Sequence, residues 1–469
     1  MHGGISGAAH AAASVWSSAF RRLGAFADPG RINAELQTLR RPTRSIVFPG
    51  GQAGAGFYTR PVNTVRLGII GLGNIGRFHA GYVVEGKVAR CELTAVCSRN
   101  PAARAEFIAK VAAMRAGGNE GQAGSAVPLR QHGPLIVFES EKQLMRSGLV
   151  DAVLIATPHW QHPAAGMAAF EAGLHVMVEK PIAAHKADAE RFIAAQRRHP
   201  KCMFGVMSQF RAEPRYQKMR ELIRSGALGS LVRVSWINTD WFRPEAYYAS
   251  SEWRATWRGE GGGVLINQCL HNLDMLQWLV GMPARVRGFC KFGRFHDIEV
   301  EDDVTAYFEW ANGATGTFVS STGEAPGTNR LEISGTRGRL LLENGKLLFT
   351  VNEVDAVEKC KSADQPFAKL ASTTEEVPFE NAAQPHAVLL QNFVNAILDG
   401  EALLAPGAEG INAVELANAI VHSSLLEKTV ELPLDGAAWE EKLNELVANS
   451  RAKKVVRAVA GDVASSFKR

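Results

Sequence analysis

A glycine-rich turn between an apolar strand and a helix constrains the fold of this chain more than any other feature. The apolar run Val65–Ile70 is followed by G-L-G-N-I-G at 71–76, and then by a helical pattern. In such a turn the first glycine makes the bend, the second lets backbone approach a pyrophosphate, and the third lets helix pack on strand. The helix N-terminus then offers unpaired N–H groups to the phosphates. The predicted cofactor-binding residues of this turn are Gly71, Gly73, Asn74, Ile75 and Gly76.

Buried strands alternate with helices up to residue 207. The expected strands are 65–70, 93–97, 135–138, 152–156, 175–178 and 203–207, and the expected helices are 74–84, 101–115, 163–172 and 187–198, with a Gly-rich loop at 116–133. This alternation is typical of a doubly wound parallel sheet. We therefore expect a dinucleotide-binding Rossmann domain over residues 65–207.

The pattern changes after residue 208. Strand-like runs at 231–239, 285–292, 304–310, 315–321, 330–334 and 339–342 are separated by turns, and helices are expected at 385–398 and 408–425. This predicts a second domain over 208–438 with an open, predominantly antiparallel β-sheet and few helices, the candidate substrate-binding domain. A charged helical tail is expected over 439–469.

Charge and hydropathy exclude two classes of partner. Residues 1–64 carry seven arginines and two acidic residues, so the rest of the chain has 45 charges of each sign. A neutral body of this kind predicts no nucleic-acid partner. Since no uncharged apolar run approaches the ~20 residues that cross a bilayer, we expect no membrane partner either.

The N-terminal segment and the cysteines bear on location. Residues 1–64, rich in Ala, Gly, Ser and Arg, are expected to be an arm or leader; an organelle transit peptide is the alternative. The six cysteines contain no C-x-x-C pair, which suits a reducing compartment and indicates no metal site. A cytoplasmic protein is the expectation, or an organellar one if the leader is a targeting signal.

The end of the second strand bears on the choice of cofactor. An acidic residue there usually accepts hydrogen bonds from a free ribose 2′-hydroxyl. This chain has Cys97-Ser98-Arg99-Asn100 instead. Ser98 and Arg99 suit a 2′-phosphate, although Arg99 is also compatible with a solvated loop position. The cofactor is therefore expected to be NADP or NAD.

Two further strand ends contribute to the same edge of the sheet. Thr157 and Pro158 follow the fourth strand, where they are expected to line the nicotinamide ribose, and His162 either joins them or only packs the turn. Glu179-Lys180-Pro181 ends the fifth strand, so the Lys180 ammonium can hydrogen-bond a substrate oxygen during hydride transfer. Glu179 is expected to tune or pair with that ammonium, and the proline suggests a cis bond. Glu179 and Lys180 are also expected to be cofactor-binding residues.

A polar triplet marks the segment after the triple glycine 261–263. On a helix through this segment Asn267, His271 and Asp274 fall within roughly 60° of one another, whereas the apolar residues cluster on the opposite side. A solvent-exposed face usually carries Lys and Glu rather than Asn, His and Asp. The triplet is therefore expected to face a substrate.

Taken together, these residues resemble the Gfo/Idh/MocA oxidoreductases of sugars, inositols and related polyols. The resemblance covers residues 65–435 and rests on four elements: the glycine turn, A-T-P-H-W-Q-H at 156–162 with A-G-L-H-V at 172–176, E-K-P at 179–181, and the triple glycine leading to His271 and Asp274. It implies that Lys180 and His271 contact the reacting hydroxyl. It also implies homodimers or homotetramers packed through C-terminal sheets.

One departure from the family pattern concerns the general base. Members often have an aspartate where this chain has Asn267, and an amide can orient a substrate but cannot take a proton. Proton transfer then falls on His271, whose unperturbed pKa near 6.5 suits exchange close to neutrality. Asn267, Asp274, Arg211 and Trp241 are the expected substrate-binding residues, with segment 208–211 helping to line the pocket.

Three functions are compatible with these motifs. The first is an NAD(P)-dependent dehydrogenase or reductase acting on a secondary alcohol or ketone of a sugar, sugar acid or polyol. The second is a glycosidase or lyase that oxidises its sugar transiently with bound NAD. The third is a non-catalytic regulator that senses sugars or dinucleotides, against which the retention of Lys180 and His271 argues.

Overall fold

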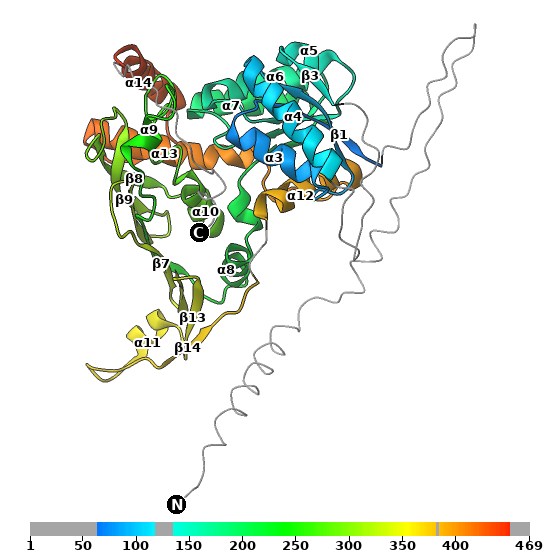
Figure 1. Ribbon diagram of the computed structural model, residues 1–469. Coiled ribbons are helices and arrows are strands. Elements are labelled where there is room, and N and C mark those ends of the chain that lie inside the picture. The colour runs from blue at the N-terminus through cyan, green and yellow to red at the C-terminus, as the bar shows by residue number, and fades with distance from the viewer. Residues whose placement is uncertain (1–62, 118–134, 381–383, 451–469) are drawn as a thin grey trace, which may run out of the picture. The chain divides into compact units, whose positions relative to one another are not determined.

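The computed structural model describes residues 63–117, 135–380 and 384–450 (Figure 1). All of these belong to one unit of the chain, Pro61–Arg469. Most of the predicted extension 1–64, nearly all of the Gly-rich loop 116–133 and the end of the tail 439–469 lie outside the described residues.

The first sheet is parallel throughout and has six strands. They are β1 (Val65–Ile70), β2 (Cys91–Cys97), β3 (Ile136–Phe138), β4 (Ala152–Ile155), β5 (His175–Val178) and β6 (Phe204–Val206). Their order, β3-β2-β1-β4-β5-β6, places β1 beside β4, where the direction of winding reverses. Ligands bind outside the carboxyl ends of the strands at such a switch point. The predicted doubly wound parallel sheet is confirmed.

Helices between these strands cover both faces of the sheet. They are α3 (Asn74–Val84), α4 (Pro101–Gly117), α5 (Glu141–Arg146), α6 (His162–Glu171) and α7 (Lys186–Arg198). Helix α3 contacts α4, whereas α6 contacts α5 and α7, so the helices form two groups (Figure 1). The central strands β1 and β4 are almost completely buried, which explains their near-continuous apolar sequences.

The second sheet is mixed and has nine strands. They are β7 (Leu231–Asn238), β8 (Arg285–Phe292), β9 (Glu301–Glu309), β10 (Thr315–Ser321), β11 (Asn329–Gly335), β12 (Gly338–Glu343), β13 (Lys346–Asn352), β14 (Ser372–Glu376) and β15 (Val430–Glu431). Their order is β14-β13-β12-β11-β7-β10-β9-β8-β15. Every neighbouring pair is antiparallel except β7 and β10, which run parallel. The predominantly antiparallel sheet is confirmed, but β13, β14 and β15 were missing from the prediction.

Helices cover one face of this second sheet. The remaining helices are α8 (Pro214–Arg224), α9 (Glu245–Tyr248), α10 (Leu270–Val280), α11 (Ala356–Ser362), α12 (Pro385–Asp399), α13 (Gly410–Leu426) and α14 (Gly436–Ala448). Helix α13 packs on β8 and on α10, and it also reaches α7 beside the first sheet. Helix α12 contacts α3 and β1. The C-terminal helices thereby join the two sheets and bring α10 toward the carboxyl edge of the parallel strands.

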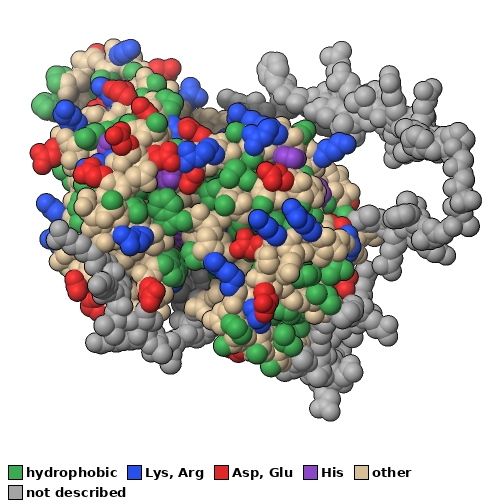
Figure 2. Space-filling model, turned by 90° about the horizontal axis from the view of Figure 1, so that it is seen from above, with side chains coloured by type: hydrophobic (Ala, Val, Ile, Leu, Met, Phe, Trp, Pro, Cys, Tyr) green, Lys and Arg blue, Asp and Glu red, His purple; other side chains and the backbone are tan. Residues whose placement is uncertain are grey.

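Two surface properties follow from the described residues. No helix in this part of the chain is both long and apolar enough to cross a membrane. On the face drawn in Figure 2, lysine and arginine side chains are interspersed with aspartate and glutamate. This mixture agrees with the neutral charge balance of the sequence outside its first 64 residues.

Candidate active site

The glycine turn has the geometry that a dinucleotide requires. A side chain on Gly71, whose φ is +100°, would place Cβ 2.5 Å from the carbonyl oxygen of Ala156. On Gly76, Cβ would lie 1.9 Å from the carbonyl oxygen of Gly71, so only glycine lets α3 approach the turn this closely. Beside Gly73 there is open space, and no side chain caps the N-terminus of α3. The turn therefore fits a pyrophosphate, with backbone N–H groups of α3 directed at it.

These differences make the glycines a matched pair for mutagenesis. Gly73→Ala is expected to fold normally, since φ is −69° and Cβ meets no protein atom. Its methyl group would occupy space that phosphates approach, so NADH should bind at least about tenfold more weakly, a loss of ~1.4 kcal/mol. Gly76→Ala is expected to lower both NADH affinity and the melting temperature. Fluorescence titration with NADH and thermal unfolding measure the two effects; unchanged NADH affinity in both variants would contradict this site.

The residues predicted to contact the adenosine ribose lie directly after β2. Ser98 is partly exposed, and its hydroxyl oxygen accepts a hydrogen bond from the N–H of Asn100 at 3.3 Å. Arg99 is exposed, with its guanidinium 3.4 Å from the side-chain oxygen of Gln161. Both residues are therefore at the carboxyl edge of the sheet, on the side of the glycine turn where β1 and β2 end.

The turn after β4 is held by His162. This histidine is buried, and its two ring nitrogens lie 2.6 Å from the carbonyl oxygen of Thr157 and 2.7 Å from that of Pro181. The ring thus ties the ends of β4 and β5 together, and burial lowers its pKa. This placement favours the interpretation that His162 packs the turn. Thr157 and Pro158 remain at the rim, with the Thr157 hydroxyl buried and without a partner among the described residues.

Lys180 projects from the end of β5, and its backbone is fixed by Glu179. The Glu179 carboxylate accepts a hydrogen bond from the N–H of Lys180 at 3.1 Å and lies 2.5 Å from Nε2 of His79, on α3. Burial would raise the pKa of Glu179, but the hydrogen bond and charge of His79, together with the charges of His386 and Lys180, lower the pKa on balance. Both carboxylate oxygens therefore have partners within the protein, and Glu179 supports Lys180. The cofactor contact assigned to Glu179 stays a prediction. The Lys180–Pro181 bond is cis, as the sequence suggested.

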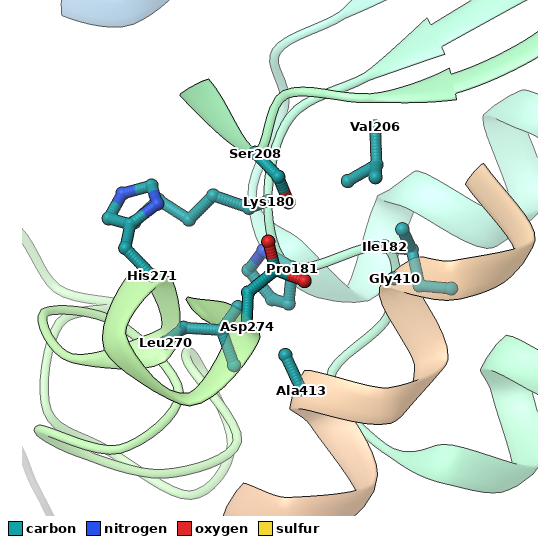
Figure 3. A pocket seen from close by; sticks show the side chains of 10 residues that line it. All are labelled: Lys180, Pro181, Ile182, Val206, Ser208, Leu270, His271, Asp274, Gly410 and Ala413. Atoms are coloured by element: carbon teal, nitrogen blue, oxygen red, sulfur yellow. The ribbon is translucent and has the colours of Figure 1, made fainter. Parts of the chain in front are cut away.

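The ammonium of Lys180 and the imidazole of His271 border the same cavity. Figure 3 shows both side chains among the ten that line it, one from the end of β5 and the other from α10. Nζ of Lys180 donates a hydrogen bond at 3.0 Å to the carbonyl oxygen of Asn267, which lies four residues before His271 in the chain. Burial lowers the pKa of Lys180, and the negative charges of Glu179 and Glu260 oppose this shift.

His271 is held by Gln209 and Phe210. The Gln209 amide nitrogen lies 3.3 Å from Nε2 of His271, and the Phe210 ring lies 4.9 Å from the imidazole, centre to centre. Burial, together with the charges of Lys180 and His386, lowers the pKa of His271 well below 6.5. The expectation of a pKa near neutrality is therefore wrong for this environment. The imidazole is neutral at pH 7, the form that accepts a proton.

The polar triplet requires two corrections. Helix α10 begins at Leu270, so Asn267 lies in the turn that precedes it, and every residue from Leu270 to Leu279 is buried. Arg211 and Asp274 form a buried bidentate ion pair, with Nε–Oδ2 at 2.9 Å and Nη2–Oδ1 at 2.7 Å. Arg211 has no exposed surface and also pairs with Glu409, whereas Asp274 is one of the ten residues that line the cavity of Figure 3. The substrate contacts assigned to these two residues stay predictions.

Trp241 lies apart from the cavity of Figure 3, whose ten lining residues do not include it. Its indole N–H donates to the side-chain oxygen of Asn238 at 2.6 Å, and the guanidinium of Arg243 lies 5.5 Å from its ring. The substrate contact assigned to Trp241 therefore stays a prediction.

Known protein families match both parts of this arrangement. Residues 65–207 match the model of an oxidoreductase family with an NAD-binding Rossmann fold, and residues 216–341 match the Gfo/Idh/MocA C-terminal domain. Together the matches cover more than half of the chain. The chain belongs to the Gfo/Idh/MocA oxidoreductase family. It is an NAD-binding enzyme, as the glycine turn predicted.

Curated Gfo/Idh/MocA relatives are similar over most of their length. Levoglucosan dehydrogenase of Pseudarthrobacter phenanthrenivorans is 25% identical over 338 residues, which are 63% of this chain and 84% of that protein. Inositol 2-dehydrogenase of Rhizobium meliloti is 25% identical over 378 residues, 79% of this chain and 99% of that protein. The crystal structure of the WlbA dehydrogenase of Bordetella pertussis, in complex with NADH and UDP-GlcNAcA, has a TM-score of 0.62 and 26% identity, and covers 79% of this chain and 100% of that one.

Sequence reasoning missed two groups of buried residues in this Gfo/Idh/MocA oxidoreductase. His79 and His386 lie together, with ring centres 5.7 Å apart, and His79 pairs with Glu179. Burial lowers the pKa of His386 to about 3. Glu260, which precedes the triple glycine, is buried beside Asn267. An acidic residue directly before a glycine run in an aromatic stretch was the available signal for Glu260.

Proposed function

We propose that this chain catalyses the reversible oxidation of a secondary alcohol of a sugar, sugar acid or polyol, with Lys180 and His271 acting on the reacting hydroxyl. The observation that carries the proposal is the cavity that these two side chains share at the carboxyl edge of the parallel sheet. The named activities of the relatives, on levoglucosan and on inositol, support the substrate class.

The chemistry divides between cofactor and protein. When bound, the cofactor supplies hydride acceptance and donation at its nicotinamide ring. His271, neutral at pH 7, takes the hydroxyl proton of the alcohol. Lys180 holds its proton on Nζ and donates a hydrogen bond to the oxygen, on which negative charge develops. In reduction of a ketone, the protonated His271 returns the proton to the oxygen, while Lys180 again donates a hydrogen bond to that oxygen.

The contacts of the two side chains suit these roles. Gln209 and Phe210 hold the imidazole in place, and the carbonyl oxygen of Asn267 fixes the ammonium. Holding the reacting groups before the substrate arrives reduces the entropy that the reaction must lose at the transition state. The neutral imidazole of His271 can accept the hydroxyl proton, and the ammonium of Lys180 can stabilise the negative charge that develops on the same oxygen.

The cofactor proposal extends to the 2′ position of the ribose. Residues 98–100, directly after β2, include no acidic residue of the kind that usually binds a free ribose 2′-hydroxyl, and Ser98 and Arg99 carry groups that can bond a phosphate. We propose that NADP is accepted as well as NAD. Direct titration of both reduced cofactors, compared between wild type and Arg99→Ala, tests this point: NADPH affinity should fall in the variant while NADH affinity is kept.

A substrate panel tests the proposed reaction. Wild-type protein is assayed at 340 nm with NAD or NADP and with myo-inositol, levoglucosan, D-glucose and D-glucuronate. Cofactor reduction by at least one of these alcohols is expected, and the Lys180→Met variant is the control. A substrate that is cleaved without net absorbance change would instead support transient oxidation by a glycosidase or lyase.

The pH dependence of kcat/KM for alcohol oxidation follows from the two pKa shifts. His271 must be neutral, and since its pKa lies well below 6.5, activity should fall only in acid below that value. Lys180 must be protonated, and since burial lowers its pKa from 10.5, activity should fall as pH rises before 10.5. A pH–rate profile with a His271→Asn control, which should lack the acid limb, measures both. An acid limb at pH 6.5 or above would contradict the assignment.

We also propose a homodimer or homotetramer formed through the open face of the nine-stranded sheet. Phe289, Tyr307 and Ile237 are 52%, 38% and 36% exposed, and Ile237 shares a cross-strand row with Val319 and Phe289. Apolar residues at the middle of an exposed sheet suit a partner sheet. Sedimentation velocity of wild type and of Phe289→Asp tests this, with dissociation expected in the variant.

The cytoplasm is the proposed location. The six cysteines are free thiols and five of them are buried. Unpaired cysteines are usual in a reducing compartment. Fractionation of cells that express the full-length chain tests the proposal, and recovery in an organelle would favour a targeting role for residues 1–64.

A further inference from the structure

Glu260 is a buried carboxylate for which the proposed reaction has as yet no role. It is 2% exposed and stands directly before the triple glycine. Its Oε2 accepts a hydrogen bond from the N–H of Ala255 at 2.6 Å, and its Oε1 accepts one from Nδ2 of Asn267. Ala255 has φ +49°, a left-handed conformation that non-glycine residues rarely adopt. One carboxylate thus holds both the turn at Ala255 and the side chain of Asn267.

Asn267 connects this carboxylate to the ammonium of Lys180. The carbonyl oxygen of Asn267 accepts the hydrogen bond from Nζ of Lys180 at 3.0 Å, while its side chain donates to Glu260. Its Nδ2 also lies 3.4 Å from the hydroxyl of Tyr247. With the amide N–H groups directed at Glu260 and Tyr247, Oδ1 is the atom of this side chain suited to accept a hydrogen bond from a substrate hydroxyl.

We propose that Glu260 and Asn267 form a matched positioning pair, in which the Glu260 carboxylate places a negative charge near Lys180 and holds the Asn267 side-chain amide, so that the backbone carbonyl oxygen of Asn267 fixes the position of the ammonium. The inference rests on the proposed function, since it assigns Lys180 the role described above. Glu260 acts through Asn267 and Lys180, and is a positioning residue.

Other ionisable groups near Lys180 also affect its pKa. Groups whose charge interacts with that of Lys180 are Glu179, Arg254, Cys269, His159, His162, His271 and His386. Glu179 is already paired with His79, and Arg254 donates to the hydroxyl of Tyr247 at 2.8 Å. Arg254 lowers the pKa of Lys180, whereas Glu260 raises it. Glu260 therefore offsets a neighbouring cation as well as the effect of burial.

A specific incompatibility follows. Asn267→Asp would put a second carboxylate within hydrogen-bonding distance of Glu260 in a buried site. Two such carboxylates cannot both remain ionised, so one takes a proton and the pair titrates as a unit. The substitution should therefore disrupt the site, although it introduces an acid that the family often has at this position. Glu260→Gln in the same chain should relieve the conflict, because it restores one acid and one amide.

The first test measures Lys180 without cofactor or substrate. Competitive labelling with acetic anhydride, read by mass spectrometry of the peptide that carries Lys180, gives the pKa of its amine in the full-length protein. Glu260→Gln is expected to lower that pKa by about one pH unit, as removal of a nearby opposite charge does. Glu260→Asp keeps the negative charge but shortens the side chain that reaches Asn267, so it should leave the pKa of Lys180 unchanged and reduce kcat. This variant replaces Glu260→Gln as the test if Glu260→Gln does not fold.

Glu301→Gln is the matched control for this measurement. Glu301 is also buried, at 1% exposed, and accepts hydrogen bonds from the N–H groups of Gly263 and Leu265 at 2.9 and 3.1 Å. It holds the same glycine loop without contacting Asn267. Its substitution should lower the melting temperature and leave the pKa of Lys180 in place. An equal shift in both variants would overturn the proposal, as would no shift in Glu260→Gln.

The second test is rescue, measured with NAD and the alcohol of the panel that turns over fastest. Asn267→Asp should lower kcat by about 100-fold. In the double variant Asn267→Asp with Glu260→Gln, kcat should recover to within about threefold of that of Glu260→Gln alone, because the effects of residues in contact are not additive. A fully active Asn267→Asp variant, or a double variant no better than it, would refute the pair. Full activity of Lys180→Met would refute the proposed function instead. The labelling experiment measures the pKa of Lys180 without turnover, so its result would still test the pair.

Discussion

Lys180→Met is expected to lower kcat for alcohol oxidation by about 10³-fold, within the range lost when one hydrogen-bond donor to a developing oxyanion is removed. Methionine keeps the unbranched shape of the side chain but can neither donate to the substrate oxygen nor balance its developing charge. The fold should survive, because the variant loses the hydrogen bond from Nζ to the carbonyl oxygen of Asn267 but keeps the one from the backbone N–H to Glu179. NADH affinity, measured by fluorescence titration, should stay within a few-fold of wild type.

An exposed lysine provides the control for this experiment. Lys201 lies at the surface before β6, and Lys201→Met should leave kcat, KM and the melting temperature unchanged. A Lys180→Met enzyme with wild-type kcat would show that the ammonium plays no part in the chemistry. A variant that loses only NADH affinity would make Lys180 a cofactor ligand rather than a catalytic residue.

Asp274→Ala is expected to cost about 3–5 kcal/mol of stability, the usual loss when one partner of a buried ion pair is removed. Arg211 has no exposed surface, and both Asp274 oxygens accept its hydrogen bonds. Without Asp274 the guanidinium keeps only Glu409 and the carbonyl oxygen of Leu404 as hydrogen-bond partners among the described residues. At about 2–4 °C per kcal/mol for a domain of this size, the melting temperature should fall by roughly 10 °C in calorimetry.

Two comparisons make the Asp274 result specific. Arg211→Met with Asp274→Leu should recover most of the stability, because replacing a buried pair by apolar residues is often neutral. Glu445→Gln removes half of an exposed pair with Lys442 on α14 and should change stability by at most about 0.5 kcal/mol. If Asp274→Ala unfolds no more easily than Glu445→Gln, the buried pair does not stabilise the fold as described.

The sequence predicted the two sheets well because their signals are local. Each parallel strand is a short apolar run followed by a helix, and the glycine turn fixed the point where the first strand meets α3. Strand β13 reads K-L-L-F-T-V-N, an apolar pattern that the prediction left unused. Strand β14 was missed because it is an edge strand of the nine-stranded sheet, paired on one side only. Apolar alternation is weak at such an edge, since β14 reads S-T-T-E-E.

The site was predicted less completely, because periodicity does not show which side chains pair. Asn267 and His271 have helical spacing, yet the triple glycine delays the helix until Leu270 by tying the loop to Glu301. Arg211 and Asp274 lie 63 residues apart and meet only in the folded chain. Contacts over such separations leave no local pattern.

The pKa of His271 was mispredicted for the same reason. A sequence supplies the unperturbed pKa of an imidazole, whereas the shift depends on burial and on Lys180, which comes from another part of the chain. The neutral base and the lowered alkaline limit therefore follow from the structure alone.

A crystal structure of the enzyme with NADH and myo-inositol, or whichever alcohol of the panel turns over, tests the central claim most directly. Nζ of Lys180 and one imidazole nitrogen of His271 should both lie within about 3.2 Å of the same substrate oxygen. The carbon that bears this oxygen should lie about 3–3.5 Å from C4 of the nicotinamide. A substrate oxygen that contacts neither side chain, or a nicotinamide bound away from their shared cavity, would contradict the account.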